Sequence, residues 1–239
     1  MECKITQMEL FFHPELINGI CELGENEARH LRVLRKKPGD VIIITDGLGH
    51  RAECEIAESG PKKYLVYVNE IQTVTRPEPR LILGVSPLKN PDRFEWLVEK
   101  CTESGVGTIV PIVCERTEST LKKTDRLQRI IQAATIQSLQ FFMPEMTHPM
   151  SFADFIKTYD AKTKLIAWCD DVPKTSILNS LHEYENTIIL IGPEGDFTKD
   201  EFDVALQSGY QAISLGQNRL RTETAAVMAA HAFYLINSK

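Results

Sequence analysis

The stretch TIILIGPEGDFTKDEF, residues 187 to 202, decides the fold class of this chain. An apolar run of strand length stops at Gly192 and Pro193, two residue types that interrupt strands and begin turns. Thr198 and Glu201 then have the spacing of a capping box, which predicts a helix starting just after Thr198. An apolar strand followed by a helix is the repeating unit of a parallel α/β sheet.

The same unit recurs through the C-terminal part of the sequence. Four more apolar runs are each followed by a helical segment: RLILGVS (80–86), GTIVPIV (107–113), KLIAWC (164–169) and QAISLG (211–216). After the first, DRFEWLVEKCTES (92–104) has an apolar helix face formed by Phe94, Leu97, Val98 and Cys101. The alternation predicts a parallel sheet, whose ligands bind at the carboxyl ends of its strands.

The first 75 or so residues have a different pattern. VIIITDG (41–47) and KKYLVYVNEIQTV (62–74) are typical of short antiparallel strands in a small barrel. GENEARHLRVLRKKPGD (24–40) predicts an amphipathic helix ended by Pro38-Gly39. The prolines of TRPEPR mark 75–80 as a linker. We therefore predict a small β domain over 1–74 and an α/β domain over 81–239.

Composition indicates a globular protein, with 43% hydrophobic and 25% charged residues in 239. No basic leader precedes an apolar stretch and no membrane-length apolar window occurs, so we expect a cytoplasmic protein without membrane contact. The six cysteines form no CxxC pair or Cys/His cluster, so no metal site is expected. The net charge of −6 argues against nonspecific coating of nucleic acid, although a local basic patch can still bind phosphate.

Two glycine loops carry the candidate chemistry. In the first, Gly192 and Gly195 allow a ligand to approach the main chain and leave Glu194 projecting between them. In the second, Gly216 precedes a basic stretch that ends at Arg221, close to the start of the last helix. Each loop taken alone is more often a plain connection, and the coincidence of two favours a ligand site.

Thr222 is the expected cap of the last helix, TETAAVMAAHAFYLI (222–236). This helix is apolar on nearly every side and too short to span a bilayer, which predicts burial in the core or in a homodimer interface. No GxGxxG or GxxxxGK[ST] fingerprint is present, so dinucleotide and P-loop functions lose their main support.

Two stretches are strongly basic. RHLRVLRKK (29–37) contains no acid, and on a helix Arg29, Arg32 and Lys36 share a face that suits a phosphate backbone. A solvated helix surface is an equal alternative. The second stretch is interpreted more readily as a solvated face; its cations are Arg116, Lys122, Lys123, Arg126 and Arg129.

Four motifs in this order and spacing resemble the RsmE family: HLRVLRKKPGD (30–40) with the DG at 46–47, EKCTESGV (99–106), GPEGDFTKDE (192–201) and LGQNRLRTETAA (215–226). The resemblance spans essentially the whole chain. It implies a PUA-like RNA-binding β-barrel over 1–74 and a SPOUT methyltransferase domain, an α/β trefoil knot, over 81–239. Members of this family are homodimers that use S-adenosylmethionine to methylate N3 of a uridine in the 16S rRNA of the small ribosomal subunit.

The resemblance also implies site residues. Those for the cofactor are Trp168, Cys169, Ile191, Gly192, Pro193, Glu194, Gly195, Leu215, Gly216, Leu220, Arg221 and Thr224. Those for RNA are His30, Arg32, Arg35 and Lys36. We hypothesise that Arg221 stabilises negative charge on the uridine, and that Glu194 or Glu223 assists deprotonation or orients Arg221 or the cofactor ribose.

The chain departs from the family pattern at several positions. Asp196 stands where a glycine is common, and Asn218 where an arginine is common. The EQSxR-like helix appears as IQSLQ (136–140), so Ile136 and Gln140 depart and only the residues between, Gln137 and Ser138, carry over.

Three other functions compete with this one. A SPOUT methyltransferase acting on another RNA, such as tRNA, has the same motifs. A noncatalytic RNA-binding or ribosome-assembly factor has the same fold, but the retained charges of Glu194, Arg221 and Glu223 favour an enzyme. A nucleotide-dependent oxidoreductase lacks its glycine fingerprint.

Overall fold

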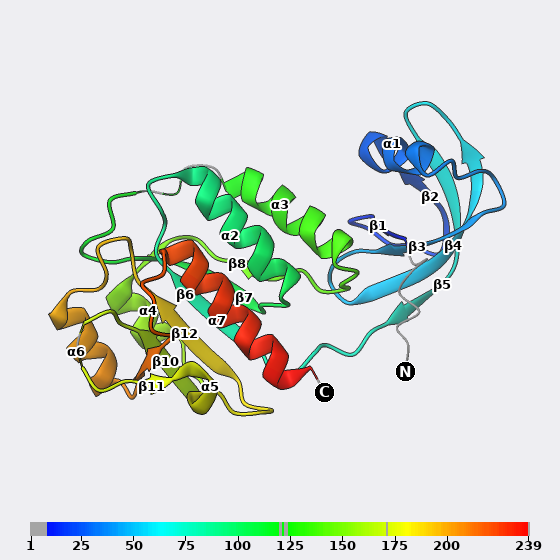
Figure 1. Ribbon diagram of the computed structural model, residues 1–239. Coiled ribbons are helices and arrows are strands. Elements are labelled where there is room, and N and C mark those ends of the chain that lie inside the picture. The colour runs from blue at the N-terminus through cyan, green and yellow to red at the C-terminus, as the bar shows by residue number, and fades with distance from the viewer. Residues whose placement is uncertain (1–8, 120, 122–123, 171, 239) are drawn as a thin grey trace. The chain divides into compact units, whose positions relative to one another are not determined.

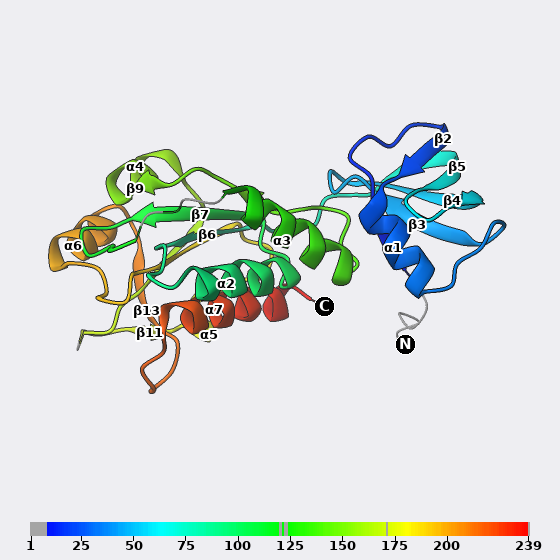
Figure 2. The same ribbon diagram turned by 90° about the horizontal axis from the view of Figure 1, so that it is seen from above.

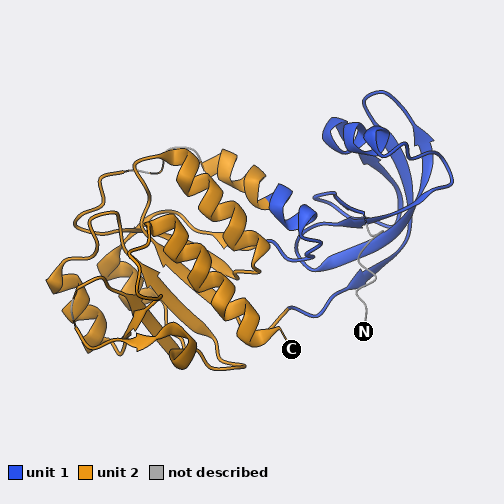
Figure 3. Cartoon of the chain, viewed as in Figure 1, with its two compact units in different colours: residues 1–76, 132–143 blue, residues 77–131, 144–239 orange. Residues whose placement is uncertain are grey.

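The computed structural model describes residues 9–119, 121, 124–170 and 172–238 (Figure 1). Contacts divide the chain into two compact units, which are described separately. The first contains residues 1–76 and 132–143, and the second contains residues 77–131 and 144–239 (Figure 3). The predicted domain division differs in one respect, because it leaves 132–143 with the C-terminal domain.

The first unit is built on a five-stranded sheet. Its strand order is β1 (Leu10–Phe12), β3 (Val41–Thr45), β4 (His50–Ser59), β5 (Tyr64–Thr73) and β2 (Gly19–Leu23). β1 pairs with β3 in parallel, and the other pairs are antiparallel. The alternation of β5 buries Tyr64, Val66 and Val68. β2 was not predicted, because only Cys21 and Leu23 of its five residues are buried.

Helix α1 (Glu25–Val33) packs Ala28 and Leu31 into the core of this unit. It ends earlier than predicted, because Arg35 adopts a left-handed conformation with φ 58° and the Lys36 N–H turns back to the carbonyl of Leu31. Lys36 therefore lies outside the helix. The prediction that Arg29, Arg32 and Lys36 share a helix face is wrong for Lys36.

The second unit contains the predicted parallel sheet. Its strand order is β11 (Thr175–Ser176), β13 (Gln211–Ser214), β10 (Thr163–Ala167), β12 (Thr187–Ile191), β6 (Leu81–Val85), β7 (Thr108–Val113) and β8 (Glu145–Met146), and β9 (Met150–Ser151) also pairs with β7. All of these pairs are parallel. The α/β class and the five predicted strands are confirmed. β8, β9 and β11 have two residues each, too few for a recognisable period. The trefoil knot stays a prediction.

Helices cover both faces of this sheet. α2 (Pro91–Glu103) and α7 (Thr222–Asn237) lie on one face, and α4 (Phe152–Thr158) and α6 (Lys199–Gln207) lie on the other (Figure 2). The remaining helices are α3 (Thr124–Gln137) and α5 (Ile177–Ser180). The predicted apolar face of α2 is buried, and α6 begins after Thr198 with the predicted capping box. Within the described residues, no helix has the length and apolar character to cross a membrane.

α7 differs from its prediction in two ways. Its N-cap is Arg221, while Thr222 is the first helical residue and is buried, so Thr222 is not the cap. The helix is also not buried all round, because Met228, Tyr234 and Leu235 are 46%, 47% and 60% exposed. Burial of α7 wholly within the core of one chain is therefore excluded.

Candidate functional site

Strand pairing brings three loops together at one edge of the second unit's sheet. β10 lies between β12 and β13 and is parallel to both, so the three strands present their carboxyl ends side by side. The following loops are 168–170, 192–198 and 215–221. The cofactor residues implied by the resemblance lie in or directly beside these loops, with Ile191 ending β12 and Thr224 in the first turn of α7. This edge is the candidate site.

Asp196 joins two of the loops. One of its carboxylate oxygens accepts the N–H of Cys169 at 2.9 Å, and the other accepts the N–H of Phe197 at 2.8 Å. Its backbone is left-handed, with φ 62°, which costs a non-glycine residue roughly 1–2 kcal/mol. Hydrogen bonds to a charged group contribute about 1.5–3 kcal/mol each and offset that cost. The departure from glycine is thus explained, because aspartate accepts this conformation and also fastens the loop after β10.

The loop after β12 is held from two further sides. Glu194 is exposed and accepts the N–H of Lys89 through Oε1 at 3.2 Å. On the other side, Arg116 donates from Nη1 to the carbonyls of Gly195 at 2.8 Å and Phe197 at 3.2 Å. Sequence reasoning did not include Arg116, since it belongs to a stretch read as solvated. These contacts fix the loop without involving the second carboxylate oxygen of Glu194.

The two predicted glycine loops need glycine for different reasons. A Cβ on Gly192 would lie 3.1 Å from the ring and the N–H nitrogen of Phe197, so this position is restricted by packing. Gly216 has φ +131°, which side-chain-bearing residues rarely adopt, and a Cβ there would meet nothing within 4 Å. The main chain at Gly216 therefore borders open space, where a ligand can approach it closely.

The start of α7 contains two charged residues in different environments. Arg221 is exposed, and its carbonyl accepts the N–H of Ala225 at 2.8 Å to open the helix. Glu223 has a side chain only 10% exposed, with its carboxylate 3.7 Å from Nε of Arg93 on α2. Arg221 is available to a ligand at the candidate site, whereas Glu223 is engaged with a neighbouring helix.

Trp168 contributes to the site through its main chain. Its indole is buried and stacks on Phe202 with ring centroids 4.2 Å apart, so the side chain belongs to the core. Its carbonyl accepts from Nζ of Lys174 at 3.1 Å, and the same ammonium donates to the carbonyl of Asp170 at 2.7 Å. Lys174 closes this loop and was missed, because nothing in its sequence context signals such a role.

The predicted RNA-binding residues lie in the first unit. His30, Arg32 and Arg35 are exposed, whereas Lys36 forms an ion pair with Glu9 at 2.6 Å. Of the second basic stretch, Arg126 pairs with Glu95 at 2.7 Å, and Lys122 and Lys123 lie outside the described residues. The exposed cations of α1 and its C-terminal turn are therefore the better candidates for a phosphate-binding surface.

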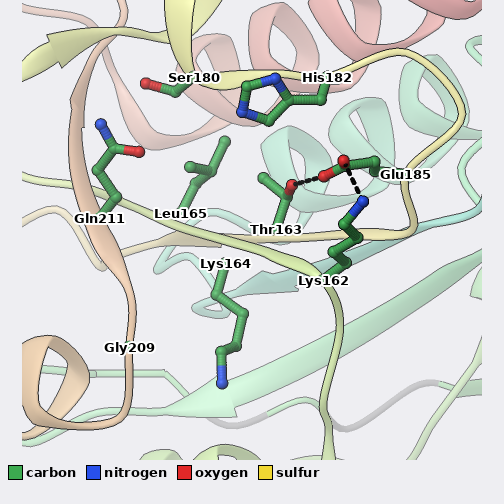
Figure 4. Close-up of a pocket in the computed structure, with 9 residues that line it drawn as sticks. All are labelled: Lys162, Thr163, Lys164, Leu165, Ser180, His182, Glu185, Gly209 and Gln211. Carbon is green, nitrogen blue, oxygen red and sulfur yellow. Dashed lines mark hydrogen bonds and ion pairs between the residues drawn. The ribbon is translucent and has the colours of Figure 1, made fainter.

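A pocket at the opposite edge of the sheet is a different feature (Figure 4). Its lining includes Thr163 and Gln211, the first residues of β10 and β13. Lys162 and Thr163 both contact Glu185, at 2.6 and 2.8 Å, so these polar groups are already partnered. The pocket lies away from the glycine loops and is not the candidate site. Among the residues the structure describes, no group of three potential metal ligands is found.

Family models match both units. An RNA methyltransferase domain matches residues 76–234, and an RNA methyltransferase PUA domain matches residues 23–67. The ribosomal RNA small subunit methyltransferase E of Mesomycoplasma hyopneumoniae is 31% identical over 227 residues, which cover 92% of this chain and 96% of that protein.

Solved structures agree over almost the full length. A probable rRNA methyltransferase from Porphyromonas gingivalis is 34% identical with a TM-score of 0.89, covering 97% of this chain and 99% of that one. The ribosomal RNA small subunit methyltransferase E of Neisseria gonorrhoeae, solved with bound S-adenosylmethionine, is 27% identical with a TM-score of 0.84, covering 97% and 98%.

The parallel sheet with its three gathered loops and the attached PUA domain define the class as RNA methyltransferase. Within that class, the chain belongs to the ribosomal RNA small subunit methyltransferase E family.

Cys169 provides a reporter for this site. It is exposed, while the other described cysteines, Cys21, Cys54, Cys101 and Cys114, are buried. Burial and the neighbouring Asp196 carboxylate raise the pKa of the Cys169 thiol, and burial raises the pKa of Cys54 to about 12. Among these five cysteines, iodoacetamide should therefore label Cys169 first, slowly at pH 7 and faster as pH rises toward 9, because the thiolate is the nucleophile. Peptide mass mapping checks this, and equal labelling of Cys101 would contradict the burial pattern.

Proposed function

We propose that this chain transfers a methyl group from S-adenosylmethionine to N3 of a uridine in 16S rRNA of the small ribosomal subunit. The observation that carries the proposal is the convergence of three loops beside β10, with exposed Arg221 opening α7 at the same edge. Family membership supports rRNA as the substrate, and the Neisseria gonorrhoeae relative is described with S-adenosylmethionine bound. Because such a protein acts where ribosomal subunits are assembled, the proposal includes a cytoplasmic location.

The loops suit an adenosyl ligand. Gly216 presents open main chain for close approach, and the loop after β10 is fastened by Asp196 and Lys174. Loops that are already ordered lose little conformational entropy when a ligand binds. We assign cofactor binding to the residues implied by the resemblance, with Trp168 acting through its backbone.

Arg221 supplies the electrostatic part of the mechanism. Bound S-adenosylmethionine supplies an electrophilic methyl group, and the protein must make N3 of the uridine nucleophilic. N3 carries a proton, so negative charge develops on the base as that proton leaves. A guanidinium facing a uridine carbonyl stabilises this charge in a site that excludes water. Arg221 suits this role, because no carboxylate lies within 4.0 Å of it among the described residues.

The two carboxylates receive different roles in this proposal. Glu194 is exposed, and within the described ranges its hydrogen bond is to the Lys89 amide, through one carboxylate oxygen. We assign proton acceptance to Glu194, since its second oxygen is open to substrate. Glu223 is buried against Arg93 and is assigned to orienting the start of α7, and with it Arg221.

Methyl transfer to small ribosomal subunits that lack this modification tests the proposal, with mass mapping of the product. At saturating S-adenosylmethionine, where weaker cofactor binding does not contribute, Arg221→Ala should lower turnover by about 10²–10³-fold, the range for loss of one transition-state hydrogen-bond donor. Arg129→Ala removes an exposed arginine of α3 and serves as the matched control. Wild-type turnover by Arg221→Ala would show that the role belongs to another residue.

Protection of Cys169 tests where the cofactor binds. Saturating S-adenosylmethionine should slow iodoacetamide labelling of Cys169 at least several-fold, since the ligand would cover the loop after β10. Denatured protein, in which labelling should not depend on the cofactor, is the control. Cofactor binding measured by calorimetry without any protection of Cys169 would move the cofactor away from this loop.

The basic surface at α1 is proposed to bind RNA through phosphates. Replacing both Arg32 and Arg35 by alanine should weaken RNA binding and reduce its dependence on salt, because fewer counterions are released. Filter binding at several salt concentrations measures this. Lys63→Ala is a suitable control, as Lys63 is a barrel cation paired with Glu22 at 2.9 Å. An unchanged salt slope in the double variant would remove the assignment.

A homodimer is proposed from the exposed side of α7. Met228, Tyr234 and Leu235 expose large apolar surface on a helix that otherwise packs on the sheet, and contact with a second copy would cover it. Sedimentation equilibrium should give twice the chain mass of 27.1 kDa, and Leu235→Glu should shift the protein toward monomer. A wild-type monomer at micromolar concentration would refute the dimer.

An RNA other than 16S rRNA, such as tRNA, is the second candidate substrate. The product mapping described above separates the two, because it identifies the methylated nucleotide. Measuring whether the purified protein binds S-adenosylmethionine distinguishes a noncatalytic assembly factor, since such a protein has no need of this cofactor.

A further inference from the structure

The loop between β3 and β4 is pinned by the segment 141–143, which follows α3 in the chain. The N–H of Gly49 donates to the carbonyl of Phe141 at 2.9 Å, and the N–H of Met143 donates to the carbonyl of Gly47 at 2.8 Å. Both partners belong to the first compact unit. The loop and the segment therefore form one fixed surface feature of that unit.

Glycine is required for this contact. A Cβ on Gly49 would lie 2.3 Å from the ring of Phe142, and a Cβ on Gly47 would lie 2.7 Å from the methyl carbon of Met143. Both glycines also have positive φ, of 71° at Gly47 and 102° at Gly49. The aromatic segment is thus seated directly on the backbone of the loop, while Leu48 between the glycines is 68% exposed.

Two arginines lie over the aromatic rings of this segment. The guanidinium carbon of Arg51 is 5.8 Å from the ring centroid of Phe141, and that of Arg76 is 5.2 Å from the ring centroid of Phe142. Both rings are half-buried. We call Arg51, Arg76, Phe141 and Phe142 the Arg–Phe cluster. Cation–π contacts of this kind orient a guanidinium without neutralising its charge.

The two arginines of the cluster differ in their acidic neighbours. Arg51 approaches Glu53 at 3.3 Å, whereas Arg76 is exposed and has no carboxylate within 4.0 Å in the described part of the chain. Asp46 is buried and is committed to Nδ1 of His50 at 2.6 Å, which directs the other ring nitrogen of the partly exposed His50 away from the carboxylate. A polyanion can therefore approach Arg76.

We propose that the Arg–Phe cluster binds an unpaired stretch of the substrate RNA, and this rests on the proposed function. Phosphates would bind the guanidinium of Arg76, and bases would stack on the exposed parts of the Phe142 ring and the guanidinium planes. Unpaired RNA is the partner that presents both a phosphate chain and free base faces, whereas a duplex keeps its bases stacked inside. The cluster adds base contacts to the phosphate contacts of α1.

The test is binding of a fluorescein-labelled oligouridylate to the full-length protein, measured by anisotropy at several salt concentrations. Arg76→Ala should weaken binding about fivefold or more and lower the salt slope by about 0.7, the value for one phosphate contact on a single strand. Arg76→Lys should keep the slope and still lose affinity, because lysine has no planar group to stack. A hairpin of equal length should bind less tightly to the wild type and respond less to either variant.

Lys63→Ala is the matched control, since it removes an exposed charge from the same unit. The inference is overturned if Arg76→Ala binds oligouridylate as tightly as the control does. It is also overturned if polyglutamate at equal charge concentration displaces oligouridylate, because that result would indicate an acidic-peptide site. Neither result depends on catalysis. Failure of the wild type to methylate ribosomal subunits would instead overturn the proposed function and leave these binding results unaffected.

Discussion

The site depends on the position of β10 between β12 and β13. Ile166 pairs with Leu190 on one side and with Ala212 on the other, so the three strands end at nearly the same level. All five residues of β12 are buried, which holds that strand in the interior of the sheet. Each crossover carries the chain back to the edge where parallel strands begin, so all of these strands end at the opposite edge. The loops that leave their carboxyl ends therefore come together. Segments distant in sequence become one surface in this way.

The side chain of Asp196 adds a direct link between two of these loops. Its carboxylate fastens the loop after β10 to the loop after β12, across 27 positions of sequence. The residue has a left-handed conformation, which favours glycine, and its carboxylate supplies two acceptors. At a position where the resemblance leads one to expect glycine, aspartate thus adopts the left-handed backbone and also joins the two loops.

Much of the second unit could be predicted, because its signals are local. Strands such as TIILI and the helix face of Phe94, Leu97 and Val98 are set by short-range periodicity, and Thr198 with Glu201 marks a helix start within four residues. The missed parts depend on contacts far apart in sequence. β2 gains its order from pairing with β5, and the grouping of 132–143 with the first unit follows from tertiary contacts alone. Likewise the roles of Arg116, which binds carbonyls of the loop after β12, and Lys174, which binds carbonyls a few residues before it, have no sequence signature.

The interleaving of the two units limits where the chain can be divided. The chain completes the sheet of the first unit by residue 76, enters the second unit, and returns to the first for residues 132–143 before completing the second (Figure 3). A fragment ending at residue 76 would lack the aromatic segment that covers Gly47 and Gly49. A single cut after residue 76 therefore does not release the first unit intact, because part of that unit comes later in the chain. Separating the two units intact would need the segment 132–143 to stay with residues 1–76.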